Sequence, residues 1–383
     1  MTDKAYRGPK IPISASLFLR KVPFIDTRSP GEFDKGAFPT AINLPLMNNE
    51  ERALVGTCYK TQGQTAAIEL GHELVSGAVK QSRIDQWIKQ LEQQPDTVLY
   101  CFRGGLRTKI SLEWLADAGF AVPYVEGGYK AMRHFLINTI EAAAQYPWLV
   151  VAGKTGSGKT ELLKAARAEP SDIATVDLEH LANHRGSAFG GEVTPQPSQI
   201  NFENALAIEL LRLEACAVRR VLVEDEGRLI GRAFVPLAVQ EVIRRSPIVE
   251  LVRPFEQRAQ AIAEDYVLRR ERELVELSGN GAPSVDILQQ IEDRLLEQLG
   301  SIKRRLGGER LATLKQQLTA AFDRYRVNRD LTEHYSWIEP LLLEYYDPMY
   351  EHQASRSDRE LLFRGTQSEI LQWLNERTDQ PDR

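Results

Sequence analysis

The chain has 383 residues, with 48 Lys and Arg against 53 Asp and Glu, a formal net charge of -5. This length corresponds to about two or three domains and is sufficient to bury a large core. With 43% hydrophobic and 26% charged residues, the composition excludes a mainly disordered, collagen-like or coiled-coil chain. The negative charge excludes a uniformly basic nucleic-acid binder, so any nucleic-acid contact has to come from a local patch.

Cysteine usage and hydropathy indicate the cellular compartment. Three cysteines are too few for a disulfide framework, and their odd number fits a reducing environment. The first six residues, MTDKAY, do not begin a basic segment followed by an apolar one, so no secretory signal is expected. No apolar run approaches about 18 residues, so no membrane span is expected. These features predict a cytoplasmic protein.

Short apolar runs alternate with helical patterns in the first part of the chain, residues 1–145. This alternation predicts an α/β domain with a mainly parallel sheet. The stretch 50–77 resembles an insertion that contains one helical run, 66–75. Strands are expected over 22–26, 97–102 and 122–125, and helices over 106–118 and 129–144.

A second parallel-sheet domain is predicted over residues 146–255, again from strands with helices between them. After Pro254 the pattern becomes helical as far as Leu374, which predicts a helical extension over 256–383. Cys216 falls in a helical run, 206–218, and is expected in the core. The four expected strands are 148–152, 173–178, 220–226 and 248–252.

A glycine-rich loop follows the first strand of this second domain. The sequence GKTGSGKT fits G-x-x-x-x-G-K-[ST] between a predicted strand and a predicted helix, the context that a phosphate-binding P-loop requires. Backbone N–H groups and the helix N-terminus would face oxyanions, Lys159 would add an ammonium group, and the Thr160 hydroxyl would hold a divalent cation. The residues expected to bind a diphosphate group are Gly153, Gly156, Ser157, Gly158, Lys159 and Thr160.

The strand 220–226 ends in three carboxylates, Glu224, Asp225 and Glu226. Glu224 or Asp225 is the expected acidic partner of the glycine-rich loop and would hold water on Mg²⁺. A solvated strand end is the alternative interpretation. The loop itself predicts a diphosphate-like or triphosphate-like group but specifies neither a nucleotide nor hydrolysis.

Cys101 lies at a turn between a predicted strand and a predicted helix, in the sequence CFRGGLR. Converging backbone N–H groups, the helix N-terminus and two arginines, Arg103 and Arg107, would stabilise a thiolate there. Gly104 and Gly105 give the loop freedom to curl around a sulfur adduct. The segment therefore predicts a nucleophilic cysteine rather than a buried structural one.

The N-terminal domain resembles the rhodanese family. The resemblance lies in FIDTRSPGEF at 24–33, GAFPTAINLP at 36–45 and the cysteine loop at 101–107. Cys-x₅-Arg is also a phosphatase signature. However, Tyr100 stands where tyrosine phosphatases have histidine, and the Asp26 and Arg28 motif favours rhodanese. Residues 1–145 are therefore expected to form a rhodanese-like domain whose cysteine carries a chalcogen atom.

A rhodanese domain joined to a P-loop domain closely resembles the family of bacterial tRNA 2-selenouridine synthases. Further stretches are similar to that family: VGTCYK at 55–60, GSAFG at 186–190, QPSQINFE at 196–203 and YYDPMY at 345–350. The resemblance covers nearly the whole chain. It implies an α/β fold, with a P-loop domain extended by C-terminal helices.

The resemblance implies a two-step reaction at the wobble 2-thiouridine of a tRNA anticodon loop. Geranyl diphosphate first geranylates the sulfur, and selenium from selenophosphate then replaces the S-geranyl group. Cys101 would carry selenium as S-selanylcysteine, with Arg103 and Arg107 attracting selenophosphate. The glycine-rich loop would hold the diphosphate, with Mg²⁺ as a possible additional requirement. An enzyme that supplies selenophosphate is an expected partner.

Residues 301–330 carry eight Lys and Arg against three Asp and Glu, which predicts a surface for the tRNA backbone. Solvated helix surface is the alternative. Phe189, Phe202 and Tyr266 are considered as stacking partners for unpaired bases, against core packing. The basic residues are Lys303, Arg304, Arg305, Arg310, Lys315, Arg324, Arg326 and Arg329.

Two other functions are compatible with the sequence. One is a rhodanese-type sulfurtransferase fused to an ATP-dependent P-loop kinase or ATPase, which would turn over ATP without tRNA. The other is a non-catalytic docking module, which the presence of Cys101 disfavours.

Overall fold

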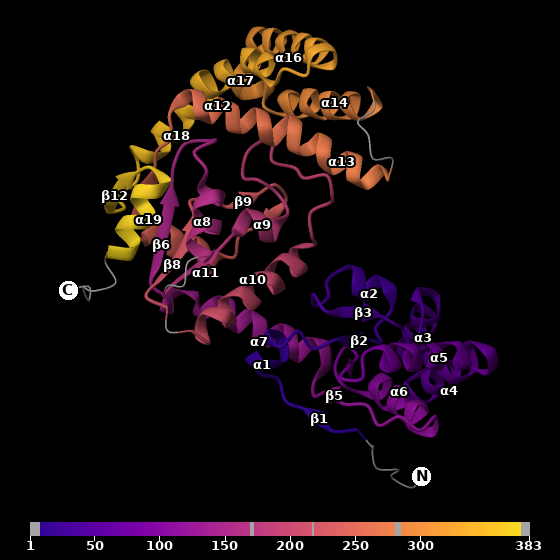
Figure 1. Cartoon of the computed structure of the whole chain (residues 1–383). Coiled ribbons are helices and arrows are strands. Elements are labelled where there is room, and N and C mark those ends of the chain that lie inside the picture. The colour runs from indigo at the N-terminus through magenta and orange to yellow at the C-terminus, as the bar shows by residue number, and fades with distance from the viewer. Residues whose placement is uncertain (1–7, 169–171, 217, 280–284, 377–383) are drawn as a thin grey trace. The chain divides into compact units, whose positions relative to one another are not determined.

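The computed structural model describes residues 8–168, 172–216, 218–279 and 285–376. Residues 1–6, for which no secretory signal is predicted, lie outside this set. The chain forms two compact units: one comprises residues 1–142 and 198–215, and the other comprises 143–197 and 216–383. The sequence analysis did not anticipate that 198–215 belongs with the first unit. Figure 1 shows the elements of each unit.

The first unit is built on a five-stranded parallel sheet with strand order β1-β5-β4-β2-β3. The three strands expected from the sequence are confirmed in shorter form. Strands β2 and β4 are buried along their whole length, as expected for the centre of a parallel sheet. The strands are β1 (Lys10–Ile11), β2 (Phe24–Asp26), β3 (Ala41–Asn43), β4 (Val98–Tyr100) and β5 (Tyr124–Val125).

Helices surround this sheet, and they include the two expected from the sequence, α6 and α7. The stretch 50–77 contains two helices, α3 and α4, separated by Gly63 with a positive φ of 88°. The helices of the first unit are α1 (Ala15–Leu19), α2 (Pro30–Asp34), α3 (Asn49–Gln62), α4 (Gln64–Leu74), α5 (Gly77–Gln93), α6 (Leu106–Asp117), α7 (Gly128–Glu141) and α10 (Gln199–Glu214).

Helix α10 is joined to the rest of the first unit by side-chain amides. Asn201 accepts a hydrogen bond from the backbone N–H of Ala37 at 2.7 Å, and Asn204 donates one to the Ala37 carbonyl at 2.9 Å. Asn204 also accepts from Arg133 of α7 at 2.8 Å. These bonds are made by the two asparagines of the sequence N-F-E-N at 201–204. They explain why α10 belongs to the first unit although it is distant in sequence from the rest of that unit.

The second unit contains a five-stranded parallel sheet with strand order β12-β11-β6-β8-β7. All four predicted strands are confirmed, and the central strand β6 is fully buried. A short antiparallel pair, β9 (Leu229–Ile230) and β10 (Ala233–Phe234), follows β8. The sheet strands are β6 (Trp148–Ala152), β7 (Ile173–Val176), β8 (Arg220–Glu224), β11 (Ile248–Leu251) and β12 (Leu361–Gly365).

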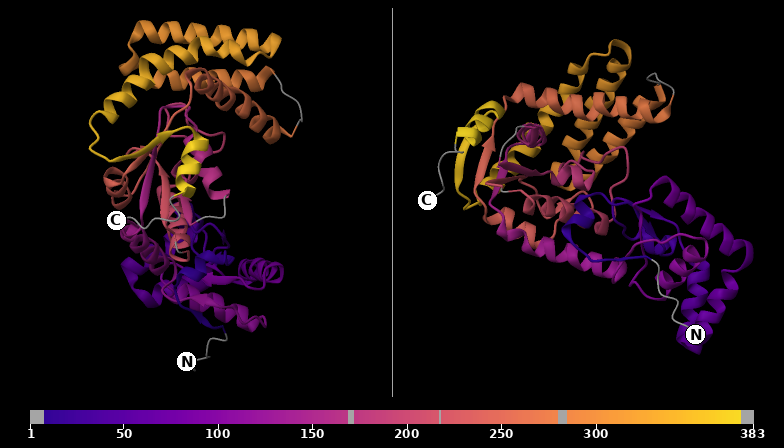
Figure 2. Two further views of the ribbon diagram at one scale, coloured as in Figure 1. Left: turned by 60° about the vertical axis from the view of Figure 1, so that its left-hand side comes forward. Right: turned by 60° about the horizontal axis from the view of Figure 1, so that its bottom comes forward.

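Strand β12 corrects the expectation that the chain is helical from Pro254 to Leu374. This segment pairs in parallel with β11 and extends the sheet by one strand, after which α19 (Gln367–Glu376) begins (Figure 2). The sequence LLFRG has no clear period-two alternation, and its pairing with β11 depends on tertiary contact.

The rest of the C-terminal segment is helical, as predicted. Its helices bury an apolar core of their own that includes Trp337, Phe322 and Leu318. The remaining helices of the second unit are α8 (Lys159–Ala168), α9 (Leu178–Ala182), α11 (Leu237–Arg245), α12 (Phe255–Ala263), α13 (Arg270–Ser278), α14 (Val285–Ser301), α15 (Lys303–Leu306), α16 (Gly308–Asn328), α17 (Tyr335–Leu341) and α18 (Asp347–Ala354). Turns η2 (Glu264–Arg269) and η4 (Leu342–Tyr346) are π-helical.

The prediction that Cys216 lies in the core is wrong. Helix α10 ends at Glu214, and Cys216 is exposed just beyond it. The spacing of apolar residues that predicted a helix as far as residue 218 continues beyond the point where α10 ends.

In the described residues, no helix is long and apolar enough to cross a membrane.

A buried ion pair is central to the first unit. Asp26 of β2 is 0% exposed and Arg28 is 2% exposed, and the two side chains are 2.6 Å apart. Arg28 also donates hydrogen bonds to the carbonyls of Glu32 and Gly36. The guanidinium therefore ties the turn after β2 to helix α2.

We expect Arg28→Ala to destabilise the first unit by about 3–5 kcal/mol, because it leaves the Asp26 carboxylate buried without its partner. Hydrogen–deuterium exchange of β2 and β4 measures this loss, with β6 as an internal reference. Lys10→Ala is the matched control, since the Lys10 to Glu126 pair is exposed and its loss should change exchange little. If β2 and β4 are protected from exchange equally in Arg28→Ala and Lys10→Ala, the buried pair does not have the stabilising role assigned to it.

Candidate functional site

The glycine-rich turn of the second unit joins the buried strand β6 to helix α8. Gly153, Gly156 and Gly158 have positive φ values of 153°, 80° and 95°. A Cβ on Gly153 would lie 2.7 Å from the Leu251 carbonyl oxygen and from the Ser157 hydroxyl. The close turn therefore requires glycine at this position, and it has the strand–loop–helix context predicted from the sequence.

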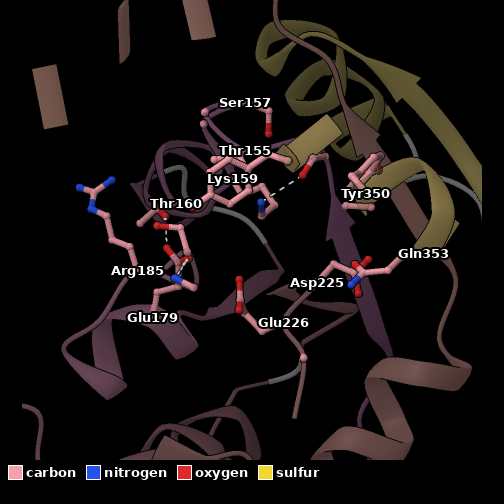
Figure 3. Close-up of a pocket in the computed structure, with 18 of the residues that line it drawn as sticks. Thr155, Ser157, Lys159, Thr160, Glu179, Arg185, Asp225, Glu226, Tyr350 and Gln353 are labelled. Atoms are coloured by element: carbon pink, nitrogen blue, oxygen red, sulfur yellow. Dashed lines mark hydrogen bonds between the residues drawn. The ribbon is translucent and has the colours of Figure 1, made fainter. Parts of the chain in front are cut away.

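The side chains of this turn face a cavity of about 790 Å³. Figure 3 shows Lys159, Thr160, Glu179 and Glu226 around it. The Lys159 ammonium donates to the Gly153 carbonyl at 3.1 Å, and the Thr160 hydroxyl donates to Glu179 at 3.0 Å. The Ser157 hydroxyl is buried and has no hydrogen-bond partner among the described residues. An ammonium, a helix N-terminus and a free hydroxyl together suit an anionic ligand.

The carboxylates nearest this turn differ from the expected pair. Glu224 is fully buried and accepts a hydrogen bond from the Leu178 backbone N–H at 3.0 Å, and it does not line the cavity. Asp225 lines the cavity but forms a bidentate pair with Arg359, at 2.8 and 2.7 Å. The acids beside Thr160 are Glu179, which the sequence analysis missed, and Glu226, which it noted but did not select.

Glu179 was detectable from its position. Strand β7 ends at Val176 and is followed at once by Asp177 and Glu179, on the strand next to β8. The carboxyl ends of parallel strands meet at one edge of a sheet, where ligands bind in open α/β folds.

In the described residues, no group of three or more His, Cys, Asp or Glu side chains is arranged to hold a metal ion.

Helices from the C-terminal segment complete the wall of this cavity. Arg258 of α12 donates to the Thr155 carbonyl at 2.9 Å and pairs with Asp347 of α18 at 2.5 Å. Arg185, Arg253 and Arg305 also line the cavity and add positive charge. An apolar part of the wall comes from Ile262, Tyr266, Tyr346, Met349 and Tyr350.

The second predicted site is the loop after β4. Cys101 is buried, with 2% exposure, and the loop runs from it to helix α6. The carbonyls of Cys101 and Phe102 accept hydrogen bonds from the backbone N–H groups of Tyr129 and Lys130, at 2.8 and 2.9 Å. The N-terminus of α7 thus holds the loop through its carbonyl side.

The opposite side of the loop presents backbone donors. The N–H groups of Arg103, Gly104 and Gly105 have no hydrogen-bond acceptor among the described residues. Successive free N–H groups of this kind form a concave site for an anion. The arrangement depends on Gly128, a residue that the sequence analysis did not select. Its φ is 59°, and a Cβ there would lie 2.4 Å from the Cys101 carbonyl oxygen.

The two arginines of the loop have different environments. Arg107 donates to Glu32 at 2.7 and 3.3 Å. Burial alone would raise the pKa of Glu32, but the hydrogen bond and charge of Arg107 lower it overall. Arg103 is exposed and has no carboxylate partner among the described residues. Arg103 is therefore the arginine available to an incoming anion.

The predicted basic surface is only partly available. Lys303, Arg304 and Arg305 lie on α15 and are exposed, and Arg305 also lines the cavity of the glycine-rich turn. Lys315 is half-buried. The other four arginines are in ion pairs: Arg310 with Glu344 (3.2 Å), Arg324 with Glu333 (2.5 Å), Arg326 with Glu292 (2.6 Å) and Arg329 with Glu271 (2.5 Å).

The aromatic residues considered for base stacking belong to the core. Phe189 and Phe202 are 0% exposed, and Tyr266 is 4% exposed and stacks on Phe189 with ring centroids 5.6 Å apart. Core packing is thus the correct interpretation of all three.

Comparisons with known proteins match both parts of the chain to known families. The family model described as the tRNA 2-selenouridine synthase AAA domain matches residues 146–381, and the model of the rhodanese-like domain matches 15–134. Similar proteins named tRNA 2-selenouridine synthase come from Shewanella denitrificans (48% identical, 94% of this chain, 96% of that one), Pseudomonas syringae (47%, 95%, 97%) and Pseudomonas savastanoi (45%, 95%, 97%).

The fold and the two sites define a rhodanese-like domain joined to a P-loop-like parallel-sheet domain with a mostly helical C-terminal part. This confirms the predicted fold class. The chain belongs to the tRNA 2-selenouridine synthase family.

The cavity of the glycine-rich turn should bind anions more weakly at high pH. Burial raises the pKa of Glu226 to about 8, the neighbouring Glu179 adds to this shift, and Lys159 opposes it. The carboxyl is therefore neutral below that pH and gains a negative charge above it. Between about pH 7 and pH 9 we expect wild-type affinity for inorganic diphosphate to fall roughly tenfold relative to Glu226→Gln.

Titration calorimetry at the two pH values measures this effect, and comparison with Glu226→Gln cancels the ionisation of the ligand itself. If the ratio of wild-type affinity to Glu226→Gln affinity for diphosphate is the same at both pH values, the charge does not come from Glu226.

Proposed function

We propose that this chain, a tRNA-modifying transferase by its family, converts wobble 2-thiouridine to 2-selenouridine in the anticodon loop of tRNA in two steps. Geranyl diphosphate serves the first step and selenophosphate the second. The observation that carries this proposal is the presence in one chain of two different loops whose residues suit an anion. One is a glycine-rich turn beside an apolar wall, and the other is a buried thiol in a rhodanese-type loop.

In the first step, the sulfur of 2-thiouridine attacks C1 of the geranyl group. A carbon–sulfur bond forms, the carbon–oxygen bond breaks, diphosphate leaves, and the N3 proton of the base is released. Lys159 and the N-terminus of α8 stabilise the charge that develops on the diphosphate. The apolar wall, which includes Ile262 and Met349, suits the geranyl chain.

The residues of this turn also fit Mg²⁺. The Thr160 hydroxyl and the Glu179 carboxylate lie 3.0 Å apart on the cavity wall, and both are oxygen ligands. Together with oxygens of the diphosphate, they would hold the cation. Mg²⁺ would neutralise charge on the leaving group.

In the second step, selenium replaces the S-geranyl group. The net reaction consumes S-geranyl-2-thiouridine, selenophosphate and water, and yields 2-selenouridine, geranylthiol and phosphate. Alkylation makes the sulfur a better leaving group. An enzyme that makes selenophosphate is the expected supplier of the selenium. We assign selenium transfer to Cys101, with Arg103 attracting the anionic donor.

Selenium carried as S-selanylcysteine is two electrons more oxidised than selenide. Loading Cys101 therefore needs a disulfide as the two-electron acceptor, and discharge onto carbon needs a thiol as the two-electron donor. One thiol–disulfide pair balances the whole cycle. The free N–H groups of the loop would stabilise the terminal selenium anion.

Lys159→Ala should slow geranylation about a hundredfold, because it removes a cation from the leaving diphosphate. Liquid chromatography with mass spectrometry of nucleosides, from 2-thiouridine tRNA and geranyl diphosphate, measures the rate. Lys154→Ala is the matched control, since Lys154 pairs with Asp347 and Glu351 and does not line the cavity.

The same assay tests the alternative function. If both variants geranylate at the wild-type rate, and wild-type protein hydrolyses ATP without tRNA, then the glycine-rich turn serves a nucleotide and the diphosphate assignment is wrong.

Cys101→Ser should reduce selenium incorporation below detection while S-geranyl-2-thiouridine still forms, because the thiol acts only in the second step. The quantity measured is the ratio of the two nucleosides in tRNA treated with both co-substrates, a thiol and its disulfide. Cys216→Ser, which removes an exposed thiol, should behave like the wild type. Equal loss of both nucleosides in Cys101→Ser would refute the separation of the two steps.

A further inference from the structure

The first unit contains a second cavity, of about 880 Å³, that the steps above do not use. Helices α3 and α4 form one side of it, and the beginning of α6 forms the other. Its wall is mainly apolar, with Met47, Val55, Ile68, Ile110 and Trp114 among the lining residues. Cavities of this size, roughly 300–1,000 Å³ with mainly apolar walls, are typical of small-molecule sites.

This cavity adjoins the loop that carries Cys101. Arg103 of the loop, with Leu106 and Arg107 from the first turn of α6, contributes to its lining. Two large apolar side chains of the lining remain accessible, since Tyr59 is 59% exposed and Leu106 is 42% exposed. Accessible apolar surface beside a reactive loop indicates a site for an apolar group of the substrate.

Positive charge also gathers at this cavity. Its lining includes Arg52, Lys60, Arg103 and Arg107. Arg52 and Arg107 both face Glu32, at 3.8 and 2.7 Å, whereas Lys60 and Arg103 have no carboxylate partner among the described residues. An apolar chain attached to a nucleotide of an RNA strand matches this combination, because the phosphates would meet the cations.

We propose that this cavity holds the geranyl chain of S-geranyl-2-thiouridine during the selenium step. The assignment rests on the proposed function. In that step a bond forms between selenium and C2 of the base, the bond between C2 and sulfur breaks, and geranylthiolate leaves and takes up a proton. The thiol named above then supplies two electrons that break the bond between selenium and the Cys101 sulfur, which frees the 2-selenouridine and the Cys101 thiol. The geranyl sulfur is bonded to the carbon that selenium attacks, so the chain has to lie beside the Cys101 loop.

Gly56 offers a clean test of this assignment. It lies in α3 and lines the cavity, and a Cβ added to it would meet no heavy atom within 4 Å. Gly56→Phe therefore reduces the cavity without a backbone clash, and it replaces a weak helix former. Gln62→Phe is the matched control, because Gln62 is exposed on the same helix and does not line the cavity.

The experiment supplies tRNA that already carries S-geranyl-2-thiouridine or S-methyl-2-thiouridine, together with selenophosphate, a thiol and its disulfide. Relative to the wild type, Gly56→Phe should convert the S-geranyl tRNA about tenfold more slowly and the S-methyl tRNA within about twofold. Geranylation of 2-thiouridine tRNA should also stay within about twofold. A second variant, Ile68→Trp, should repeat this pattern, and thermal unfolding verifies that both variants are folded.

The outcomes separate two failures. If wild-type protein converts no S-geranyl tRNA, the proposed function fails and this assignment fails with it. If the wild type converts it and both cavity variants slow the S-geranyl and S-methyl substrates equally, or slow neither, only the assignment of the cavity is overturned.

Discussion

Both sites depend on the same constraint, the placement of backbone N–H groups where a buried parallel strand passes through a glycine-containing turn into a helix. Strand β4 leads to the Cys101 loop and α6, and strand β6 leads to the glycine-rich turn and α8. In each case the strand is fully buried and fixes the start of the turn. In the Cys101 loop the turn leaves N–H groups without an acceptor among the described residues, and both turns lead into a helix N-terminus, an arrangement that suits an anion.

The two turns are supported in different ways. In the first unit, the close approach of Gly128 to the Cys101 carbonyl lets α7 hold the loop. In the second unit, Arg258 bonds to the Thr155 carbonyl and to Asp347, so helices α12 and α18 brace the turn. The C-terminal helices thus form part of the wall of the cavity at the glycine-rich turn.

Much of this organisation could be predicted from the sequence. Short runs with few polar residues located seven of the ten sheet strands in the described part of the chain, and the glycine spacing located both turns. Local patterns did not reveal Gly128 or strand β12, because their roles come from residues distant in sequence. Glu179 was missed although it directly follows the predicted strand 173–178. Likewise, the charges of Arg310, Arg324 and Arg326 are visible in the sequence, but their acidic partners in the folded chain are not.

The central claim is that the two anion sites perform separable steps linked by an S-geranyl intermediate. Complementation tests it most directly. Lys159→Ala and Cys101→Ser proteins are each incubated with 2-thiouridine tRNA, geranyl diphosphate, selenophosphate, a thiol and its disulfide. The two reactions are then mixed, and 2-selenouridine is quantified by mass spectrometry. The account predicts that neither protein alone yields substantial 2-selenouridine and that the mixture does. A mixture as inactive as its components would contradict it.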